Sequence, residues 1–178
     1  KTTLAEAMLF KAKMTSRIGE IADGTTVMDF DPEEKAHKIS IEAGIAHLNW
    51  KGRELNIVDA PGYPDFAGEA VGALSGVETA VICVNAAHGV QVNTRKMWAN
   101  AGQAGLGRAV FLTKIDHDNI DFDKLLASVK ESFGDTARIA MMPLGTGPSC
   151  KGVVSVLEAD SIADAAVKKQ ALAFREKL

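Results

Sequence analysis

The chain has 178 residues, of which 47% are hydrophobic and 24% are charged, and its formal net charge is −3. This length allows one substantial hydrophobic core and predicts one domain, or two at most. The small net charge excludes a general attraction to DNA or to anionic lipid, so any nucleic-acid contact has to be local. We expect no membrane segment, because no apolar run approaches the roughly 20 residues that span a bilayer.

The two cysteines indicate neither a metal site nor a disulfide framework. Cys83 and Cys150 lie far apart in the chain, without a CxxC pair and without a histidine at ligand spacing. The first ten residues also lack the apolar core and cleavage site of a signal peptide. We therefore expect a monomeric, cytoplasmic protein.

The first 60 residues predict a helix, a long loop and a hairpin. In residues 1–13 the apolar side chains recur at three- and four-residue spacing, which is typical of an amphipathic helix. Residues 16–38 carry many charges and no sustained periodicity, which predicts a long, mobile surface loop. Residues 39–45 and 54–58 are strand-like on either side of Lys51-Gly52, so we expect a β-hairpin here.

From Pro61-Gly62 onwards, helical and strand patterns alternate. A helix is expected to run to Leu74, and apolar runs such as residues 79–85 indicate strands buried on both faces. The alternation predicts an α/β fold, with a mainly parallel twisted sheet, helices on both faces and the hairpin as an antiparallel edge. The remaining expected elements are strands at 109–113 and 138–142 and helices near 92–101 and 121–133.

The last 36 residues predict a connector, a strand and a helix. Residues 143–151 are rich in glycine and proline, and residues 152–157 form a short apolar run. A helix is expected over residues 161–178, and Ser161 and Asp164 fit a variant of the capping box at its start.

Three short motifs carry the candidate chemistry, and the first is Lys1-Thr2-Thr3-Leu4. It matches the end of a phosphate-binding P-loop, GxxxxGK[ST], in which the lysine reaches the β- and γ-phosphates and the hydroxyl of Thr2 ligates Mg²⁺. The alternative for Lys1 is a frayed basic terminus.

The second motif, Asp59-Ala60-Pro61-Gly62, matches DxxG at the end of a predicted strand. The carboxylate of Asp59 can hold Mg²⁺ through water, and the amide of Gly62 can approach a γ-phosphate closely because there is no side chain. The alternative is a plain Pro-Gly turn that closes the strand.

The third motif, Thr113-Lys114-Ile115-Asp116, resembles the base-recognition sequence NKxD, with Thr113 in place of the commoner asparagine. A carboxylate at Asp116 can accept two hydrogen bonds from guanine that adenine does not offer, and the Lys114 stem can lie over the ring. The alternative is an ordinary strand exit. In this order and at strand ends, the three motifs predict one site for Mg²⁺ with GTP or GDP.

Longer runs of sequence show a resemblance to a known family. Residues 1–10 (KTTLAEAMLF), 24–34 (GTTVMDFDPEE) and 59–66 (DAPGYPDF) are similar to the GTP-binding G domain of elongation factor G. The resemblance covers the chain from Lys1 to about Leu157. It implies a P-loop NTPase fold, GTP hydrolysis and a ribosomal partner.

The resemblance also implies domain limits. Residues 1–151 correspond to a G domain that lacks its first strand and most of its P-loop. Residues 152–178 correspond to the start and part of a subdomain that this family inserts into its G domain.

Two positions depart from the family pattern. Ser40 stands where the family has a Mg²⁺-ligating threonine, and its hydroxyl can do the same work. Tyr63 stands where the family usually has the histidine that positions the attacking water. A phenol is a poor base at neutral pH, although it can orient a water. The position of Tyr63 after DxPG resembles the divergent elongation factor G-like paralogues, and the alternative is a ring packed on the following helix.

Three functions remain open from the sequence. The first is a GTPase that acts on the ribosome in translocation or a related step. The second is a nucleotide-dependent binding switch with negligible turnover, in which residues 16–38 signal to a partner. The third is a P-loop protein that uses ATP.

Overall fold

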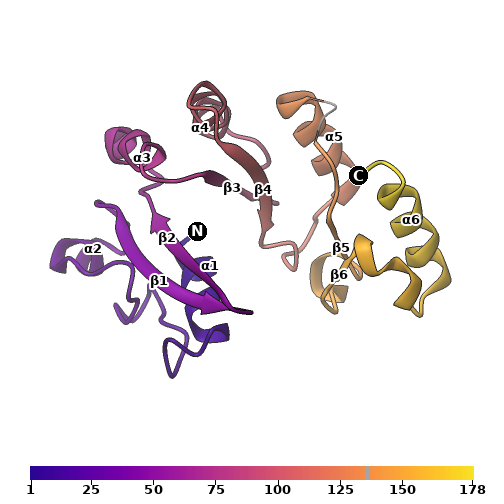
Figure 1. Cartoon of the computed structure of the whole chain (residues 1–178), viewed down its shortest axis with the longest axis horizontal. Helices are drawn as coiled ribbons and strands as arrows, with labels where there is room; N and C mark the ends of the chain where they lie inside the picture. Colours follow the sequence, from indigo (N-terminus) through magenta and orange to yellow (C-terminus); the bar gives the residue numbers. More distant parts are fainter. Residues whose placement is uncertain (135–136) are drawn as a thin grey trace. The chain divides into compact units, whose positions relative to one another are not determined.

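The computed structural model describes residues 1–134 and 137–178 (Figure 1). The contacts divide the chain into two compact units. The first comprises Lys1–Ala80 and Ala99–Arg108, and the second comprises Val81–Trp98 and Ala109–Leu178.

The first unit begins with the predicted helix, α1 (Thr2–Lys11). The predicted hairpin is also present: β1 (Gly44–Trp50) and β2 (Arg53–Asp59) pair antiparallel. Lys51 and Gly52 form the two-residue turn, and both have positive φ angles, as the tight turns of twisted hairpins require.

The expected position of the first hairpin strand, residues 39–45, is wrong. The turn at Lys51-Gly52 fixes the register, in which Trp50 pairs with Arg53 and Gly44 with Asp59. Since β2 ends at Asp59, the ladder ends at Gly44, and residues 39–43 lie outside it.

The segment 16–38 is more organised than the expected loop, because it contains α2 (Pro32–His37). Asp31 caps this helix and forms a capping box with Glu34, and Pro32 occupies its first turn. These capping signals are present in the sequence, but the many charges and the proline of the segment favoured the prediction of a loop.

The core of the first unit lies between α1 and the hairpin. Ala5 and Leu9 of the helix pack with Met28 and with Leu48 of β1, and all four are buried. Figure 1 shows α1 beside β2, in agreement with their contacts. After β2, the predicted helix to Leu74 is present as a short 3₁₀ turn, η1 (Pro64–Phe66), followed by α3 (Ala67–Leu74).

The predicted strand–helix–strand unit in the middle of the chain is confirmed as β3 (Thr79–Asn85), α4 (Val92–Gln103) and β4 (Gly107–Thr113). The Gly107 amide donates to the Glu78 carbonyl, and the Ala86 amide donates to the Thr113 carbonyl. The first residues of the two strands therefore lie beside each other, and so do their last residues, which means that the strands are parallel.

The predicted helix that follows β4 is also present, as α5 (Phe122–Phe133) with Asp121 as its N-cap. Leu125 of α5 packs on the face of β3 that carries Val84. Burial of β3 on both faces, as expected, is wrong, because Val81 is 52% exposed. An apolar run does not reveal which of its side chains another element will cover.

The last part of the second unit is a small antiparallel pair packed on a helix. β5 (Met141–Pro143) pairs with β6 (Val153–Ser155), with the 3₁₀ turn η2 (Gly147–Ser149) between them. The 3₁₀ helix η3 (Val156–Ser161) and α6 (Ala165–Arg175) follow. The buried residues Met142, Val156, Ala159 and Ala171 form the core of this part.

Both strands of this pair are shorter than expected, and the last helix begins later. Val156–Ser161 forms η3, so Ser161 ends this turn and donates to the Glu158 carbonyl. The N-cap of α6 is Asp164, whose carboxylate accepts from the amides of Ala166 and Val167. The expected start of the helix at Ser161 is therefore wrong, because Asp164 alone satisfies the free amides of the first turn.

The expected mainly parallel sheet is present only in part. The described strands pair in three two-stranded sheets, β1–β2, β3–β4 and β5–β6. The connections within the first and third pairs are too short for a crossover, so these pairs are antiparallel, whereas the connection through α4 permits parallel pairing. None of the helices in residues 1–134 and 137–178 is long and apolar enough to cross a membrane.

Candidate functional site

The end of β2 holds a buried carboxylate beside the first residue of the chain. Asp59 is only 7% exposed, and its Oδ1 atom lies 3.8 Å from Lys1 Nζ. Its Oδ2 atom is buried and has no hydrogen-bond partner among the described residues. An unpaired buried oxygen of this kind is costly, which indicates a place where a cation or a hydrogen-bond donor is missing.

The turn after β2 brings the second motif against the first. Pro61 is buried, Ala60 is half-buried and Gly62 is exposed. A Cβ atom at Gly62 would lie 3.4 Å from Lys1 Nζ, so the ammonium group lies close to the backbone of this glycine. The structure thus brings together Lys1, Asp59 and Gly62, as the two motifs predicted.

Thr2 and Ser40 also meet, although 38 positions separate them. Thr2 is 3% exposed, and its Oγ1 atom lies 3.3 Å from Ser40 Oγ. Ser40 donates to Asp29 Oδ1 at 2.7 Å, so its proton is already used and Thr2 is the donor in the first contact. The lone pairs of the Thr2 oxygen then remain free for a ligand.

Asp29 is a site residue that the sequence analysis did not identify. It is 4% exposed, and its two oxygens accept from Ser40 and, at 3.3 Å, from Thr26 Oγ1. It stands in the run 24–34 that carries the family resemblance, but nothing in its local spacing indicates that it contacts Ser40.

The oxygens at this end of the molecule fit Mg²⁺. Thr2, Ser40 and Asp59 offer two hydroxyls and a carboxylate, which are the hard ligands that this ion prefers. An octahedral ion held by these groups would also need phosphate oxygens and waters as ligands. The unpartnered Asp59 Oδ2 atom is the observation that favours this assignment. The described residues contain no cluster of three or more histidine, cysteine or acidic side chains that could hold a metal alone.

Tyr63 follows Gly62 and remains 54% exposed. Its backbone is extended, with φ −74° and ψ 141°, and it is the N-cap residue of η1. The residue is therefore accessible to solvent, and the alternative of a ring packed on the following helix stays open.

The third motif lies at the end of β4, in the second unit. Thr113 is anchored, because its Oγ1 atom donates to the Val84 carbonyl of β3 at 3.3 Å. Lys114 follows with φ +58°, a left-handed conformation that turns the chain sharply out of the strand. Lys114 and Asp116 are both exposed, whereas Ile115 between them is half-buried.

The loop between β5 and β6 supports this turn. The Gly147 amide donates to the Ile115 carbonyl at 2.9 Å. A Cβ atom at Gly147 would lie 3.2 Å from the His117 carbonyl oxygen, and Gly147 itself has φ +60°. Residues 143–151 were expected only as a connector, because such a long-range backbone contact leaves no local pattern in the sequence.

The carboxylate of Asp116 is therefore displayed on an anchored turn. Within the part of the chain that the structure describes, no partner for it is recorded, and it is exposed. Both of its oxygens are free to accept hydrogen bonds from a planar pair of donors.

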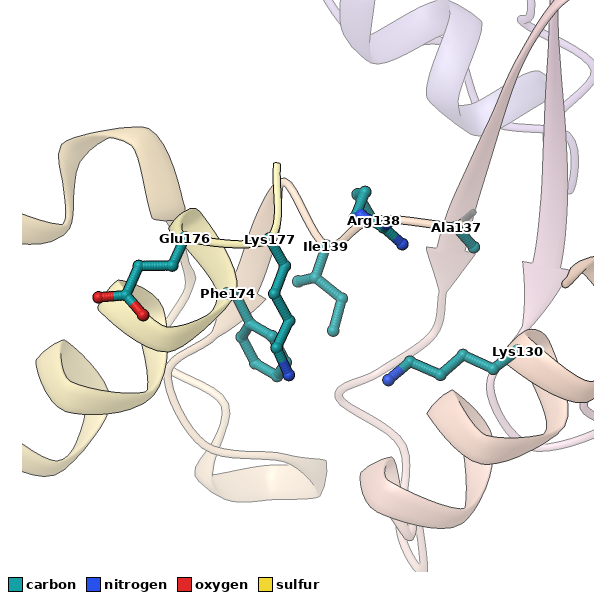
Figure 2. A pocket seen from close by; sticks show the side chains of 7 residues that line it. All are labelled: Lys130, Ala137, Arg138, Ile139, Phe174, Glu176 and Lys177. Atoms are coloured by element: carbon teal, nitrogen blue, oxygen red, sulfur yellow. The ribbon is translucent and has the colours of Figure 1, made fainter. Parts of the chain in front are cut away.

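Two cavities of the second unit lie away from all three motifs. One, of about 420 Å³, is lined by α5, the segment before β5 and the end of α6, and Figure 2 shows its residues, which include Lys130, Ile139 and Phe174. The other, of about 930 Å³, lies along β5, β6 and η3. Neither includes a residue of the predicted site.

Comparison with known proteins identifies the fold. Residues 1–173 match the family model described as the elongation factor Tu GTP binding domain. In the search of solved structures, a crystal structure from Thermus thermophilus matches 99% of this chain with a TM-score of 0.90 and 33% identity, and the chain covers 28% of it.

Curated relatives include several elongation factors. An elongation factor G-like protein of Mycobacterium tuberculosis is 39% identical over 147 residues, which is 83% of this chain and 21% of the relative. Elongation factor G 2 of Streptomyces coelicolor is 35% identical, over 88% of the chain and 23% of the relative. The mitochondrial ribosome-releasing factor 2 of Bos taurus is 32% identical, over 91% of the chain and 21% of the relative. The chain thus spans about a fifth to a quarter of the length of these relatives.

Proposed function

Because the chain belongs to the elongation factor Tu GTP-binding domain family, we propose that it binds GTP and GDP with Mg²⁺ and hydrolyses GTP. The observation that carries this proposal is the buried Asp59 carboxylate, which lies beside Lys1 and has one oxygen without a partner. The P-loop NTPase fold of translational GTPases is the fold of the chain.

The first unit would bind the phosphates and the metal. Lys1 neutralises phosphate oxygens, and the amide of Gly62 donates to the γ-phosphate. Thr2 and Ser40 would hold the ion directly, and Asp59 would hold it through water. When bound there, Mg²⁺ would supply charge stabilisation for the phosphate oxygens.

The second unit would bind the base. Asp116 accepts hydrogen bonds from the N1 and N2 donors of guanine, and the Lys114 stem covers one face of the ring. Thr113 positions the turn through its bond to β3, and Ile115 through its bond to Gly147. This arrangement selects GTP over ATP, because adenine does not present that pair of donors.

Hydrolysis would be slow in the free protein. Tyr63 can orient a water through its hydroxyl, but it does not remove a proton readily at neutral pH. Catalysis would rest on positioning and on charge stabilisation, and a ribosome would complete the arrangement.

The cellular role that we propose is a step of translation on the ribosome, in the cytoplasm, at translocation or a related stage. The names of the relatives, elongation factor G 2 and ribosome-releasing factor 2, support this role. We further propose that residues 1–151 form the G domain and that residues 152–178 begin an inserted subdomain. The separate core around Val156 and Ala171 supports that boundary.

Nucleotide binding is tested by titrating the protein that carries this chain, at its natural length, with fluorescent GDP and ADP at millimolar Mg²⁺. We expect tight binding of GDP and none of ADP at the same concentrations. Equal affinity for the two nucleotides would exclude the guanine assignment and would favour a P-loop protein that uses ATP.

A nucleotide-dependent switch with negligible turnover is the second candidate. The exposed Tyr63 in the position of a histidine favours it, because a phenol supplies no general base. Measuring GTP hydrolysis with and without ribosomes separates the two functions. Stimulation by ribosomes supports the GTPase, whereas an unchanged low rate supports the switch.

A further inference from the structure

Glu6 is a fully buried carboxylate that none of the three motifs explains. It lies on α1, one helical turn after Thr2, and is 0% exposed. Its Oε1 atom accepts from the amides of Val27 at 2.7 Å and Met28 at 3.1 Å, and its Oε2 atom accepts from the Gly19 amide at 3.2 Å. One side chain of the helix thus holds two distant points of the segment 16–43.

These three bonds require a carboxylate. Both oxygens of Glu6 face N–H donors, and the described residues offer it no cationic partner. A glutamine would turn one oxygen into an amino group, so a donor would face a donor and one buried amide would lose its acceptor.

The backbone of the segment packs tightly against the Glu6 side chain at Gly19. A Cβ atom at Gly19 would lie 2.6 Å from Glu6 Oε2, from the Thr25 carbonyl oxygen and from the Thr26 Cα. Only glycine fits there without displacing these atoms. The packing at Gly19 therefore agrees with the hydrogen bonds in showing that Glu6 anchors the segment.

The anchor connects to the predicted metal ligands. Met28, which Glu6 holds, is followed by Asp29, and Asp29 accepts the hydroxyl of Ser40. Ser40 in turn contacts Thr2, at the start of the helix that carries Glu6. The contacts form a closed ring from α1 through the segment and back to α1.

We propose that Glu6 is a positioning residue that couples the segment 16–43 to α1 and thereby sets Ser40 against Thr2. It contacts neither nucleotide nor metal. Its effect on Mg²⁺ rests on the proposed function, because that function makes Thr2 and Ser40 metal ligands. The anchoring itself does not depend on it.

Amide hydrogen exchange without nucleotide tests the anchoring. In the protein at its natural length, the amides of Val27 and Met28 are expected to exchange at least about tenfold more slowly than those of exposed residues in the same segment. Glu6→Gln is expected to speed their exchange about tenfold. The matched control is Glu42→Gln, which makes the same change at an exposed side chain with no recorded contact through its carboxylate. Equal exchange in the wild type and in Glu6→Gln would overturn the proposal.

The coupling is tested by the Mg²⁺ concentration that half-saturates binding of fluorescent GTP. Glu6→Gln is expected to raise it about three- to tenfold and to leave GDP binding without Mg²⁺ unchanged, because only the placement of Ser40 is affected. Faster exchange with an unchanged Mg²⁺ requirement would reduce Glu6 to a loop anchor and overturn the coupling.

A second variant covers a failure of Glu6→Gln to fold. Gly19→Ala keeps the carboxylate of Glu6 but crowds it and the backbone at Thr25 and Thr26, so the segment should move away from Glu6 and both measurements should shift in the same directions. Absence of GTP binding by the wild type would contradict the proposed function. The exchange data would still show whether Glu6 anchors the segment.

Discussion

The carboxylates at the ends of β2 and β4 differ in how the chain surrounds them. Asp59 is 7% exposed and lies against Lys1, whereas Asp116 is exposed and has no recorded partner in the described residues. The carboxylate proposed for the metal thus has contacts within the chain, and the one proposed for the base is open to solvent. Substitution of either carboxylate should weaken nucleotide binding, and the two should differ in which part of the nucleotide loses its contact.

The largest effect is expected from Asp59→Asn. The change removes the charge that would hold Mg²⁺, and loss of one partner from a buried charged pair costs about 3 kcal/mol, or roughly a hundredfold in affinity. The melting temperature without nucleotide should change little, because the charge left behind, Lys1, is about one third exposed, and the substitution removes a buried charge with an unpartnered oxygen. A titration with fluorescent GTP and thermal denaturation check this, and unchanged affinity would contradict the metal assignment.

The next effect is that of Asp116→Ala. Loss of two charge-assisted hydrogen bonds should weaken GDP binding by about 2–3 kcal/mol and remove the preference for GDP over ADP. Since the side chain is exposed, the melting temperature should stay the same. Asp118→Ala, in the same loop and also exposed, is the control. Equal effects of the two variants would show that the loss is not specific to base recognition.

A smaller change is expected from Tyr63→His. The exposed position accepts an imidazole without repacking, so nucleotide affinity should be unchanged. Ribosome-stimulated hydrolysis should rise by about tenfold, which is less than the roughly 10²–10⁴-fold of a full general base, because Tyr63 can already orient the water. Single-turnover hydrolysis measures this, and a rate that stays the same would remove residue 63 from the mechanism.

The smallest effect is expected at a surface pair in the second unit. Arg175 Nη1 lies 2.7 Å from Asp160 Oδ2, and this hydrogen bond, with the charge of Arg175, lowers the pKa of the Asp160 carboxyl below its ordinary 3.8. A lowered folded-state pKa means that the pair stabilises the fold above the ordinary pKa and ceases to do so as the pH falls through the folded-state value. Asp160→Asn should slightly lower the melting temperature at neutral pH and not in strong acid. An equal loss at both pH values would rule out the ion pair as its cause.

Local patterns predicted the elements well, because each pattern lies within a few residues. Helical spacing gave α1 and α5, and apolar runs gave β3 and β4. The turn at Lys51-Gly52 was predicted, but the bounds of the first hairpin strand were wrong, since the pairing with β2 continues up to Trp50.

Motifs indicated some of the contacts around the candidate site, and the contacts between distant residues were missed. Lys1 lies close to Asp59 and to Gly62, which belong to two of the motifs. The contacts of Asp29 with Ser40 and of Gly147 with Ile115 join residues that are far apart or lack a motif, so spacing could not reveal them.

The central proposal is that the motifs Asp59–Gly62 and Thr113–Asp116 bind the same guanine nucleotide, as the family match suggests. Its most direct test is hydrogen exchange of the protein at its natural length over a series of GDP concentrations with Mg²⁺. The account predicts that the peptides containing Asp59–Gly62 and Thr113–Asp116 become protected together, with one midpoint, and that ADP protects neither. Protection of only one peptide, or two different midpoints, would contradict it.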